Sequence, residues 1–123
     1  MLIPRPRDVD SLMRTVRKGR LITVGQLRKL LAARAGADQA CPLCTGIFVR
    51  IVAEAAEEDR RSGKKRVTPY WRTVKDDGSL NDKFPGGAKA QAQRLTEEGF
   101  VVQSRNGNRR PRVRDFDERL VDV

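Results

Sequence analysis

Histidine is absent from the sequence, and its absence excludes several classes of enzyme. Histidine is the commonest general base near neutral pH, so neither a Ser-His-Asp nor a Cys-His hydrolase is expected. Most catalytic zinc sites also use histidine as a ligand. We therefore predict neither of these hydrolases, and we predict that the protein holds neither a metal ion nor a cofactor.

Cysteine is scarce, and the two cysteines leave several interpretations open. Cys41 and Cys44 are too few for a disulfide framework, and a single CxxC supplies only two of the four ligands that structural zinc takes. The pair is compatible with a redox motif at a helix N-terminus, where a thiolate is stabilised, or with Cys44 as an alternative alkyl acceptor. The simplest interpretation is two small apolar side chains buried at the start of a helix.

Long apolar runs are missing as well. No run approaches the roughly 18 residues of a membrane-spanning helix. The N-terminal segment, MLIPRPRDVD, lacks the apolar stretch of a signal peptide. We predict a cytoplasmic protein that does not contact membranes.

Positive charge, by contrast, is abundant. The sequence has 26 Lys and Arg against 16 Asp and Glu, a net charge of +10. The surplus is clustered in residues 1–35, 61–75 and 105–114. On one face these segments would form an electrostatic footprint for a polyanion, whereas a basic surface kept for solubility is the alternative. We predict double-stranded DNA as the partner, a nucleoid-associated location and a monomer.

The length suits one compact domain, and we assign residues 1–123 to it. Residues 1–7 contain two prolines and are predicted to form an extended arm. A short helix is expected next, with Asp8 or Asp10 as its N-cap.

Two longer helices are predicted in the middle of the chain. Thr23 is a good N-cap, leucines then recur at helical spacing, and Gly36 ends the helix. Pro42 suits the first turn of the next helix, whose acidic end at residues 54–59 is expected to face solvent. Two helices joined by a short turn with basic flanks are typical of a helix-turn-helix.

The second half of the chain is expected to be partly extended. Residues 67–74 are predicted as an extended segment broken at Pro69, and residues 88–98 as a short helix. A strand at 100–103, an Asn-Gly turn at 106–107 and a returning strand at 112–114 indicate a basic β-hairpin. The predicted fold class is α+β and mostly helical, a winged helix-turn-helix domain with a small β-hairpin wing.

The most specific pattern lies between residues 67 and 99. A proline and an arginine are followed by an Asp-Gly-Ser turn, a Gly-Gly pair and a helix that ends in Glu-Gly. The residues concerned are Pro69, Arg72, Asp77, Gly78, Ser79, Gly86, Gly87, Leu95, Glu98 and Gly99. In this order and spacing they resemble the active-site segment of the methylguanine-DNA methyltransferase family. The stretch TVGQLRKLL at residues 23–31 is similar to a helix start in that family, and Gly46 to the glycine of its recognition helix. The resemblance implies the family's C-terminal winged-helix domain.

Two departures from the family's pattern decide the implied function. The methyl-acceptor cysteine falls on Tyr70 and the activating histidine on Trp71, and a phenol cannot replace a His-activated thiolate. The chain therefore resembles the alkyltransferase-like branch, which binds alkylated guanine, flips it and hands it to nucleotide excision repair. The resemblance implies a non-enzymatic DNA-binding protein that recognises alkylated or damaged guanine, with repair proteins as partners. The alternative is a winged-helix DNA-binding or regulatory protein without a lesion pocket.

The resemblance also implies which residues form the site. Tyr70 is expected to be a stacking wall for a flipped base, with Trp71 on the opposite face of an extended segment and Pro69 and Arg72 organising the pocket. At two further positions the residue differs from the one in the family. Val24 replaces the tyrosine that turns the target phosphate, and Leu43 replaces the intercalating arginine, although an apolar wedge can hold a base stack open.

Further DNA contacts are predicted from charge and position. The helix that begins at Pro42 would enter a groove by its N-terminal end, where free N–H groups favour phosphate. The predicted contacts there are Gln39, Thr45 and Arg50. Predicted phosphate contacts elsewhere are Lys64, Lys65 and Arg66 in a loop and Arg105, Arg109, Arg110 and Arg112 on the hairpin.

Overall fold

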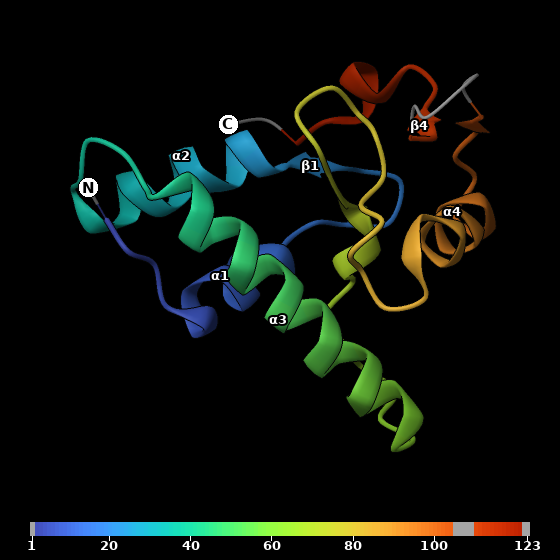
Figure 1. Ribbon diagram of the computed structural model, residues 1–123, viewed down its shortest axis with the longest axis horizontal. Coiled ribbons are helices and arrows are strands. Elements are labelled where there is room, and N and C mark those ends of the chain that lie inside the picture. Colours follow the sequence, from blue (N-terminus) through green and yellow to red (C-terminus); the bar gives the residue numbers. More distant parts are fainter. Residues whose placement is uncertain (1, 105–109, 122–123) are drawn as a thin grey trace.

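The computed structural model describes residues 2–104 and 110–121 and shows an α+β fold that is mostly helical (Figure 1). Within those residues the helices are α1 (Pro6–Met13), α2 (Val24–Ala35), α3 (Pro42–Arg61) and α4 (Gly87–Glu97). The strands are β1 (Ile22–Thr23), β2 (Thr73–Val74), β3 (Val102–Gln103) and β4 (Arg112–Val113). Two 3-10 turns are η1 (Tyr70–Arg72) and η2 (Phe116–Arg119). The predicted fold class is confirmed at this coarse level.

Helix α2 begins and ends at the predicted signals, and α3 begins at its predicted signal. Thr23 caps α2 in a capping box, in which its side chain accepts a hydrogen bond from the Gln26 N–H and the Gln26 side chain accepts one from the Thr23 N–H. Gly36 ends α2 in the left-handed conformation, with φ at 66°. Pro42 is in the first turn of α3, where its missing N–H costs nothing.

Helix α1 starts earlier than predicted, and neither aspartate caps it. The helix begins at Pro6, and Arg5 occupies the N-cap position without a capping hydrogen bond. Asp8 lies in the first turn, where a negative charge favours the helix dipole, and it pairs with Arg5 at 3.2 Å. Asp10 lies further inside the helix. The local proline therefore overrides the expected aspartate cap.

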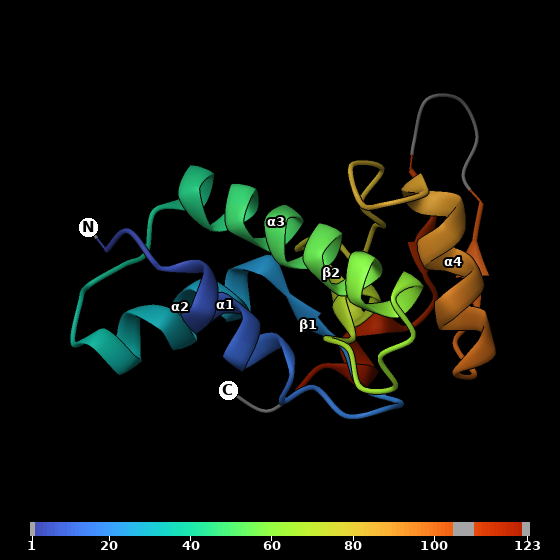
Figure 2. The same ribbon diagram turned by 90° about the horizontal axis from the view of Figure 1, so that it is seen from below.

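The N-terminal arm is correspondingly shorter than the predicted residues 1–7. The Leu2 N–H donates to the carbonyl of Gln39 at 2.9 Å, and the Leu2 carbonyl accepts from the Cys41 N–H at 2.8 Å. These hydrogen bonds hold the arm against the connection between α2 and α3 (Figure 2).

A small parallel pairing lies at the centre of the molecule. β1 pairs with β2, with Ile22 opposite Thr73. On the other side of β1, Leu21 forms a bridge with Leu120 near the C-terminal end of the described chain. Each of these pairings joins segments that are far apart in the sequence.

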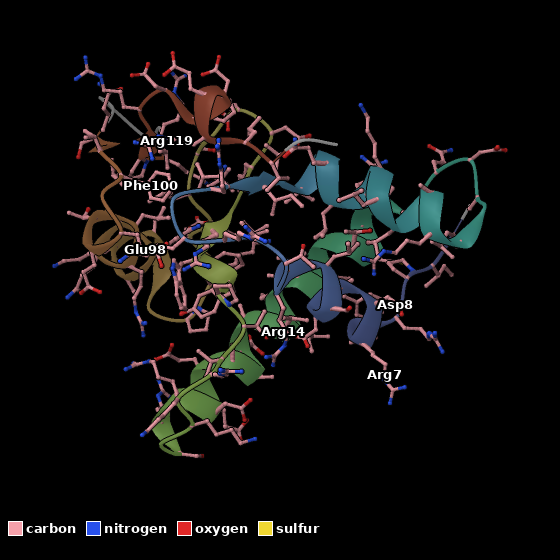
Figure 3. The ribbon with its side chains drawn as sticks, turned by 180° about the vertical axis from the view of Figure 1, so that it is seen from behind. Arg7, Asp8, Arg14, Glu98, Phe100 and Arg119 are labelled. Carbon is pink, nitrogen blue, oxygen red and sulfur yellow. The ribbon has the colours of Figure 1, made fainter. Side chains whose placement is uncertain are left out.

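The predicted hairpin pairing is present, but its first strand is shorter than residues 100–103. β3 and β4 are antiparallel, with Val102 opposite Val113. The expected turn at 106–107 lies outside the described residues. Arg119 of η2 packs over the ring of Phe100 at 5.3 Å, so the C-terminal segment also contacts the segment that follows α4 (Figure 3).

Residues 67–74 do not form the predicted extended segment. The Arg72 N–H donates to the carbonyl of Pro69 at 3.1 Å and closes η1, so that only Thr73 and Val74 are left to form a strand. The prediction was wrong because alternation of side chains cannot reveal a single tight turn after a proline.

Helix α3 is the central element of the core. It contacts α1, α2 and η1. Its buried apolar residues, spaced along one face, are Val49, Val52, Ala53 and Ala56. The opposite face of α3 is left exposed, which positions the site described next.

Among the described residues, no helix is both long and apolar enough to cross a membrane.

Candidate functional site

One face of α3 exposes apolar side chains around a glycine. Leu43 is 72% exposed and Ile47 is 47% exposed. A Cβ added to Gly46 would meet no atom within 4 Å apart from its chain neighbours and the nearby backbone of its own helix. Glycine inside a helix costs roughly 0.5–1 kcal/mol relative to alanine, so a glycine that nothing in the chain requires is unexpected there. Its absent side chain leaves room for a molecule outside the chain.

A loop before α4 lies beside this face and completes a groove. The groove has a volume of about 230 Å³. Its lining residues are Pro42, Leu43, Gly46, Ile47 and Arg50 of α3 and Asn81 and Lys83 of the loop. Figure 2 shows this loop projecting on the same side of the molecule as α3. We call these seven residues the α3 groove; they combine an apolar floor with the cations Arg50 and Lys83.

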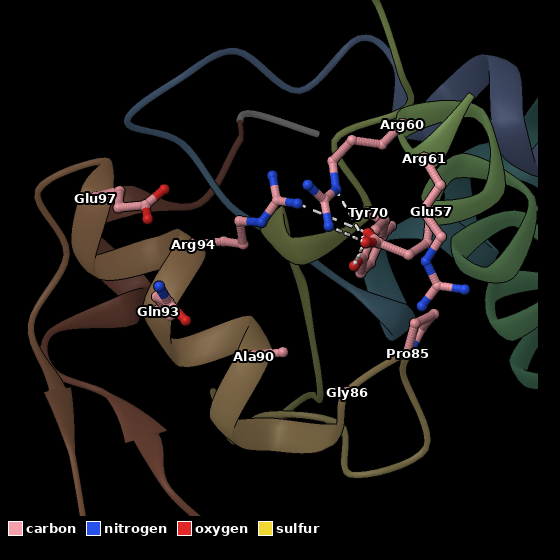
Figure 4. Close-up of a pocket in the computed structure, with 10 residues that line it drawn as sticks. All are labelled: Glu57, Arg60, Arg61, Tyr70, Pro85, Gly86, Ala90, Gln93, Arg94 and Glu97. Carbon is pink, nitrogen blue, oxygen red and sulfur yellow. Dashed lines mark hydrogen bonds and ion pairs between the residues drawn. The ribbon is translucent and has the colours of Figure 1, made fainter. Parts of the chain in front are cut away.

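Tyr70 is buried behind the other end of α3, in a cluster of charged groups. Its side chain is only 3% exposed, and its hydroxyl donates to Oε2 of Glu57 at 3.0 Å. Oε1 of Glu57 accepts from Nε of Arg60 at 2.9 Å, and Nη2 of Arg94 lies 3.7 Å from Oε2 (Figure 4). The carboxylate is therefore fully engaged by three neighbours.

This cluster holds each group in one protonation state at neutral pH. The hydrogen bonds from Arg60 lower the pKa of Glu57 below its usual value. Burial, together with the neighbouring carboxylate, raises the pKa of Tyr70 to about 12. Tyr70 is thus a neutral phenol that is already committed as a donor, and it is poorly suited to act as a nucleophile.

A cavity opens beside Tyr70, between the C-terminal end of α3, the loop before α4, and α4 itself (Figure 4). Its volume is about 400 Å³, within the range of small-molecule sites, roughly 300–1,000 Å³. The lining residues are Glu57, Arg60, Arg61, Tyr70, Pro85, Gly86, Ala90, Gln93, Arg94 and Glu97. We call it the Tyr70 cavity.

Trp71 does not lie opposite Tyr70 as an extended segment would require. Both rings are buried and meet edge to face, with their centroids 5.3 Å apart, because η1 turns the chain. Tyr70 makes a second contact of the same kind with Phe84. Arg94 covers the Trp71 ring at 4.9 Å. Trp71 is therefore behind the cavity, where it supports Arg94.

Arg72 is a buried structural residue. Its Nε and Nη2 donate to the two carboxylate oxygens of Glu98 at 2.9 and 2.6 Å, and Nη1 donates to the carbonyl of Val16 at 2.7 Å. Burial alone would raise the pKa of Glu98, but the hydrogen bonds from Arg72 outweigh it and the pKa is lowered. Arg72 ties η1 to α4 and to the segment after α1 and does not line the cavity.

The remaining predicted contacts are only partly brought together. Arg50 and Leu43 belong to the α3 groove. Thr45 is fully buried, and its hydroxyl donates to the carbonyl of Cys41 at 2.7 Å, so its predicted contact with DNA does not fit the structure. Val24 and Pro69 are half-buried and line neither site.

The basic loop and hairpin residues lie outside both sites. Lys64 pairs with Asp59 at 3.2 Å, whereas Lys65, Arg66 and Gln39 are exposed. Arg110 pairs with Asp82 at 3.4 Å, and Arg112 packs near the Phe116 ring at 6.0 Å. The predicted contacts Arg105 and Arg109 lie outside the described residues.

Cys41 caps α3 with its sulfur. The Cys44 N–H donates to Sγ of Cys41 at 3.4 Å, and this hydrogen bond lowers the pKa of the Cys41 thiol. Both cysteines are free and half-buried, so the expectation of two fully buried side chains is not met. In the described part of the chain, no group of three or more acidic, His or Cys side chains is arranged to hold a metal ion.

Several residues of the site were not predicted, among them Glu57 and Gln91. Glu57 was expected in the solvent-exposed end of α3, yet it is buried. Its spacing of four residues after Ala53, itself four after Val49, places it on the buried face and could have revealed it. Gln91 is buried in α4, where its amide donates to the carbonyls of Trp71 and Thr73. It also accepts the Asn81 N–H and so links η1 to the loop before α4.

The lowered pKa of Glu57 predicts a specific loss of stability in acid. A carboxylate whose pKa is lower in the folded protein stabilises the fold above its unfolded pKa, and this stabilisation is lost as the pH falls through the folded pKa. We expect the variant Glu57→Gln to lose less stability than the natural protein between about pH 6 and about pH 3. Urea unfolding at both pH values measures this. Glu54→Gln, an exposed control on α3, should follow the natural protein; equal losses in all three would contradict the prediction.

Comparison with known proteins gives support at the level of the fold. No protein-family model matches the chain, and no curated protein sequence matches it. Among solved structures, the chain is similar to S. pombe Atl1, determined in complex with damaged DNA containing O6-carboxymethylguanine. The TM-score is 0.65 at 15% identity, and the match covers 96% of this chain and 94% of that chain. At this identity the likeness shows the fold alone, and at that level it supports the resemblance drawn from the sequence.

Proposed function

We propose that this protein binds double-stranded DNA and recognises a damaged or alkylated guanine without chemically altering it. The observation that carries the proposal is the Tyr70 cavity. It lies beside the residue that falls on the family's acceptor position and has the volume of a small-molecule site. A flipped base would enter this cavity, while the α3 groove contacts the duplex.

Three further observations support the proposal. The net charge of +10 favours a polyanionic partner. Gly46 leaves the exposed face of α3 open to close approach. The solved structure of similar fold contains damaged DNA. We include in the proposal a single winged helix-turn-helix domain over residues 1–123, in which α2 and α3 form the helix-turn-helix and β3 and β4 the wing. It acts as a nucleoid-associated cytoplasmic monomer that passes lesions to repair proteins.

The burial of both aromatic rings favours one alternative, a DNA-binding protein without lesion recognition. Tyr70 and Trp71 offer little free surface on which a base could stack. The two functions differ in one property. A lesion-recognising protein distinguishes damaged from undamaged duplexes, whereas a general DNA-binding protein holds both through phosphate contacts.

A titration with labelled duplexes separates the two functions. One duplex carries a single O6-methylguanine and the other is undamaged, and anisotropy is measured at two salt concentrations. We expect tighter binding of the damaged duplex with a change in Trp71 emission, because Arg94 links Trp71 to the cavity. Ala90→Phe, which fills the cavity, should remove the preference and leave the affinity for undamaged DNA unchanged. Ala35→Phe, on exposed α2 surface, is the control. Equal and steeply salt-dependent affinities for both duplexes would refute lesion recognition.

A further inference from the structure

The free polar groups of the Tyr70 cavity are mostly hydrogen-bond donors. The two oxygens of Glu57 already accept from Tyr70 and Arg60 and face Arg94. Within residues 2–104 and 110–121, the side chains of Arg61 and Gln93 have no hydrogen-bond or ion-pair partner. A guanidinium carries five N–H donors and no acceptor. A ligand that satisfies this lining therefore has to present acceptors.

The charge of the cavity points to the same kind of ligand. The lining contains three arginines and two glutamates, Glu57 and Glu97. Because Tyr70 is neutral, the lining carries a net positive charge. Glu57 is held by its own partners at the floor, where its side chain is only 10% exposed. Glu97 is exposed on α4 and, within the described residues, is the one acidic group of the lining that has no ion-pair partner. Its repulsion of an anion is weaker because its charge is solvated.

The arrangement of the three guanidinium groups leaves one of them available. Figure 4 shows those of Arg60 and Arg94 directed towards the Glu57 carboxylate, whereas that of Arg61 lies on the side of Pro85. Arg60 and Arg94 are therefore compensated, and Arg61 is not. A free guanidinium in a cavity is well suited to bidentate binding of a planar or tetrahedral oxyanion.

We propose that the Tyr70 cavity is an oxyanion-binding site centred on Arg61, with the Gln93 amide as a second donor. The oxyanion is a carboxylate or a phosphate. On DNA it has two sources, an acidic substituent on a base that enters the cavity or a phosphate of the backbone. The site itself requires only the cavity and its donors and does not depend on lesion recognition.

The first test uses inorganic phosphate and no DNA. A ligand that binds only the folded protein raises Tm with its concentration. We expect phosphate to raise Tm more than chloride at equal ionic strength, and Arg61→Ala to lose most of this difference while Arg61→Lys keeps part of it. Arg66→Ala, which removes another exposed arginine outside the cavity, should respond like the natural protein. An unchanged response in Arg61→Ala, or an equal loss in Arg66→Ala, would overturn the proposal.

The second test identifies the source of the oxyanion on DNA. The duplexes carry O6-carboxymethylguanine, its neutral isostere O6-carbamoylmethylguanine, or a single neutral methylphosphonate in place of one phosphate near the lesion. With the O6-carboxymethylguanine duplex, whose backbone phosphates are all intact, Arg61→Ala should bind about tenfold more weakly than the natural protein does. The effect should disappear with the carbamoyl isostere if the source is the base, and with the methylphosphonate if it is the backbone. A loss that persists in every neutralised duplex contradicts the site, whereas absence of any DNA binding refutes only the proposed function.

Discussion

Replacing Arg72 with methionine is expected to lower the free energy of unfolding by about 3–5 kcal/mol. The side chains of Arg72 and Glu98 are only 14% and 12% exposed. The substitution leaves the Glu98 carboxylate buried without its partner and the carbonyl of Val16 without a donor. Removing one member of a buried ion pair costs far more than the pair contributes on balance, because an uncompensated charge stays in the interior.

Urea unfolding of three variants tests this explanation. The double variant Arg72→Met with Glu98→Met should recover much of the lost stability, because no buried charge is left. Arg50→Met is the control for an exposed pair; Arg50 and Glu54 are 3.6 Å apart and both solvated, so its effect should stay within about 1 kcal/mol. An Arg72→Met protein as stable as Arg50→Met would show that the buried pair is not what holds η1 in place.

Substituting Gly46 with leucine is expected to separate stability from DNA binding. Apart from its chain neighbours and the nearby backbone of its own helix, the new side chain meets no atom of the chain within 4 Å at its Cβ. A helix interior prefers leucine to glycine, so the free energy of unfolding should rise by up to about 1 kcal/mol. The affinity for duplex DNA should fall by about tenfold or more, because the added atoms occupy the space between Leu43 and Ile47 through which a duplex would approach.

The two effects are measured on the same sample, by urea unfolding and by anisotropy with labelled duplex. Ala55→Leu places an equal side chain at an exposed position of α3 outside the α3 groove, and it should leave the affinity unchanged. Lower stability in Gly46→Leu would mean that the glycine serves the fold. Full affinity with higher stability would exclude the α3 groove as the duplex contact.

The helices were predictable because their signals are local. Thr23, Gly36 and Pro42 act through the hydrogen bonds of one helical turn, so their effect does not depend on distant contacts. The buried face of α3 was placed wrongly: the apolar spacing of Phe48, Ile51, Val52 and Ala55 suggested one stripe, whereas Ile51 and Ala55 are exposed and Val49, Ala53 and Ala56 are buried. The start of α1 was missed by a few residues, since Pro6 is as strong a local signal as the aspartates that follow it.

The site was less predictable because it depends on groups that meet only after folding. Tyr70 and Trp71 were singled out from the sequence, but their burial follows from η1 and from the contact of Tyr70 with Phe84. Glu57 and Arg94, which surround the Tyr70 hydroxyl, come from two helices. A buried charge cluster of this kind has no periodic signature, since each member is an ordinary surface residue type when considered alone.

The pairings of β1 have a consequence for how the chain reaches this fold. Leu21 donates to the carbonyl of Arg119 at 2.8 Å and accepts from Val121 at 2.9 Å, so these hydrogen bonds close a loop that spans most of the chain. The entropy of closing such loops is lost before their contacts contribute, and long-range pairing slows folding. The central strands should therefore assemble last, around helices that are already docked. The rate of folding will be lower than the helical content alone suggests, and the Tyr70 cavity, which depends on the turn just before β2, will be among the last features to form.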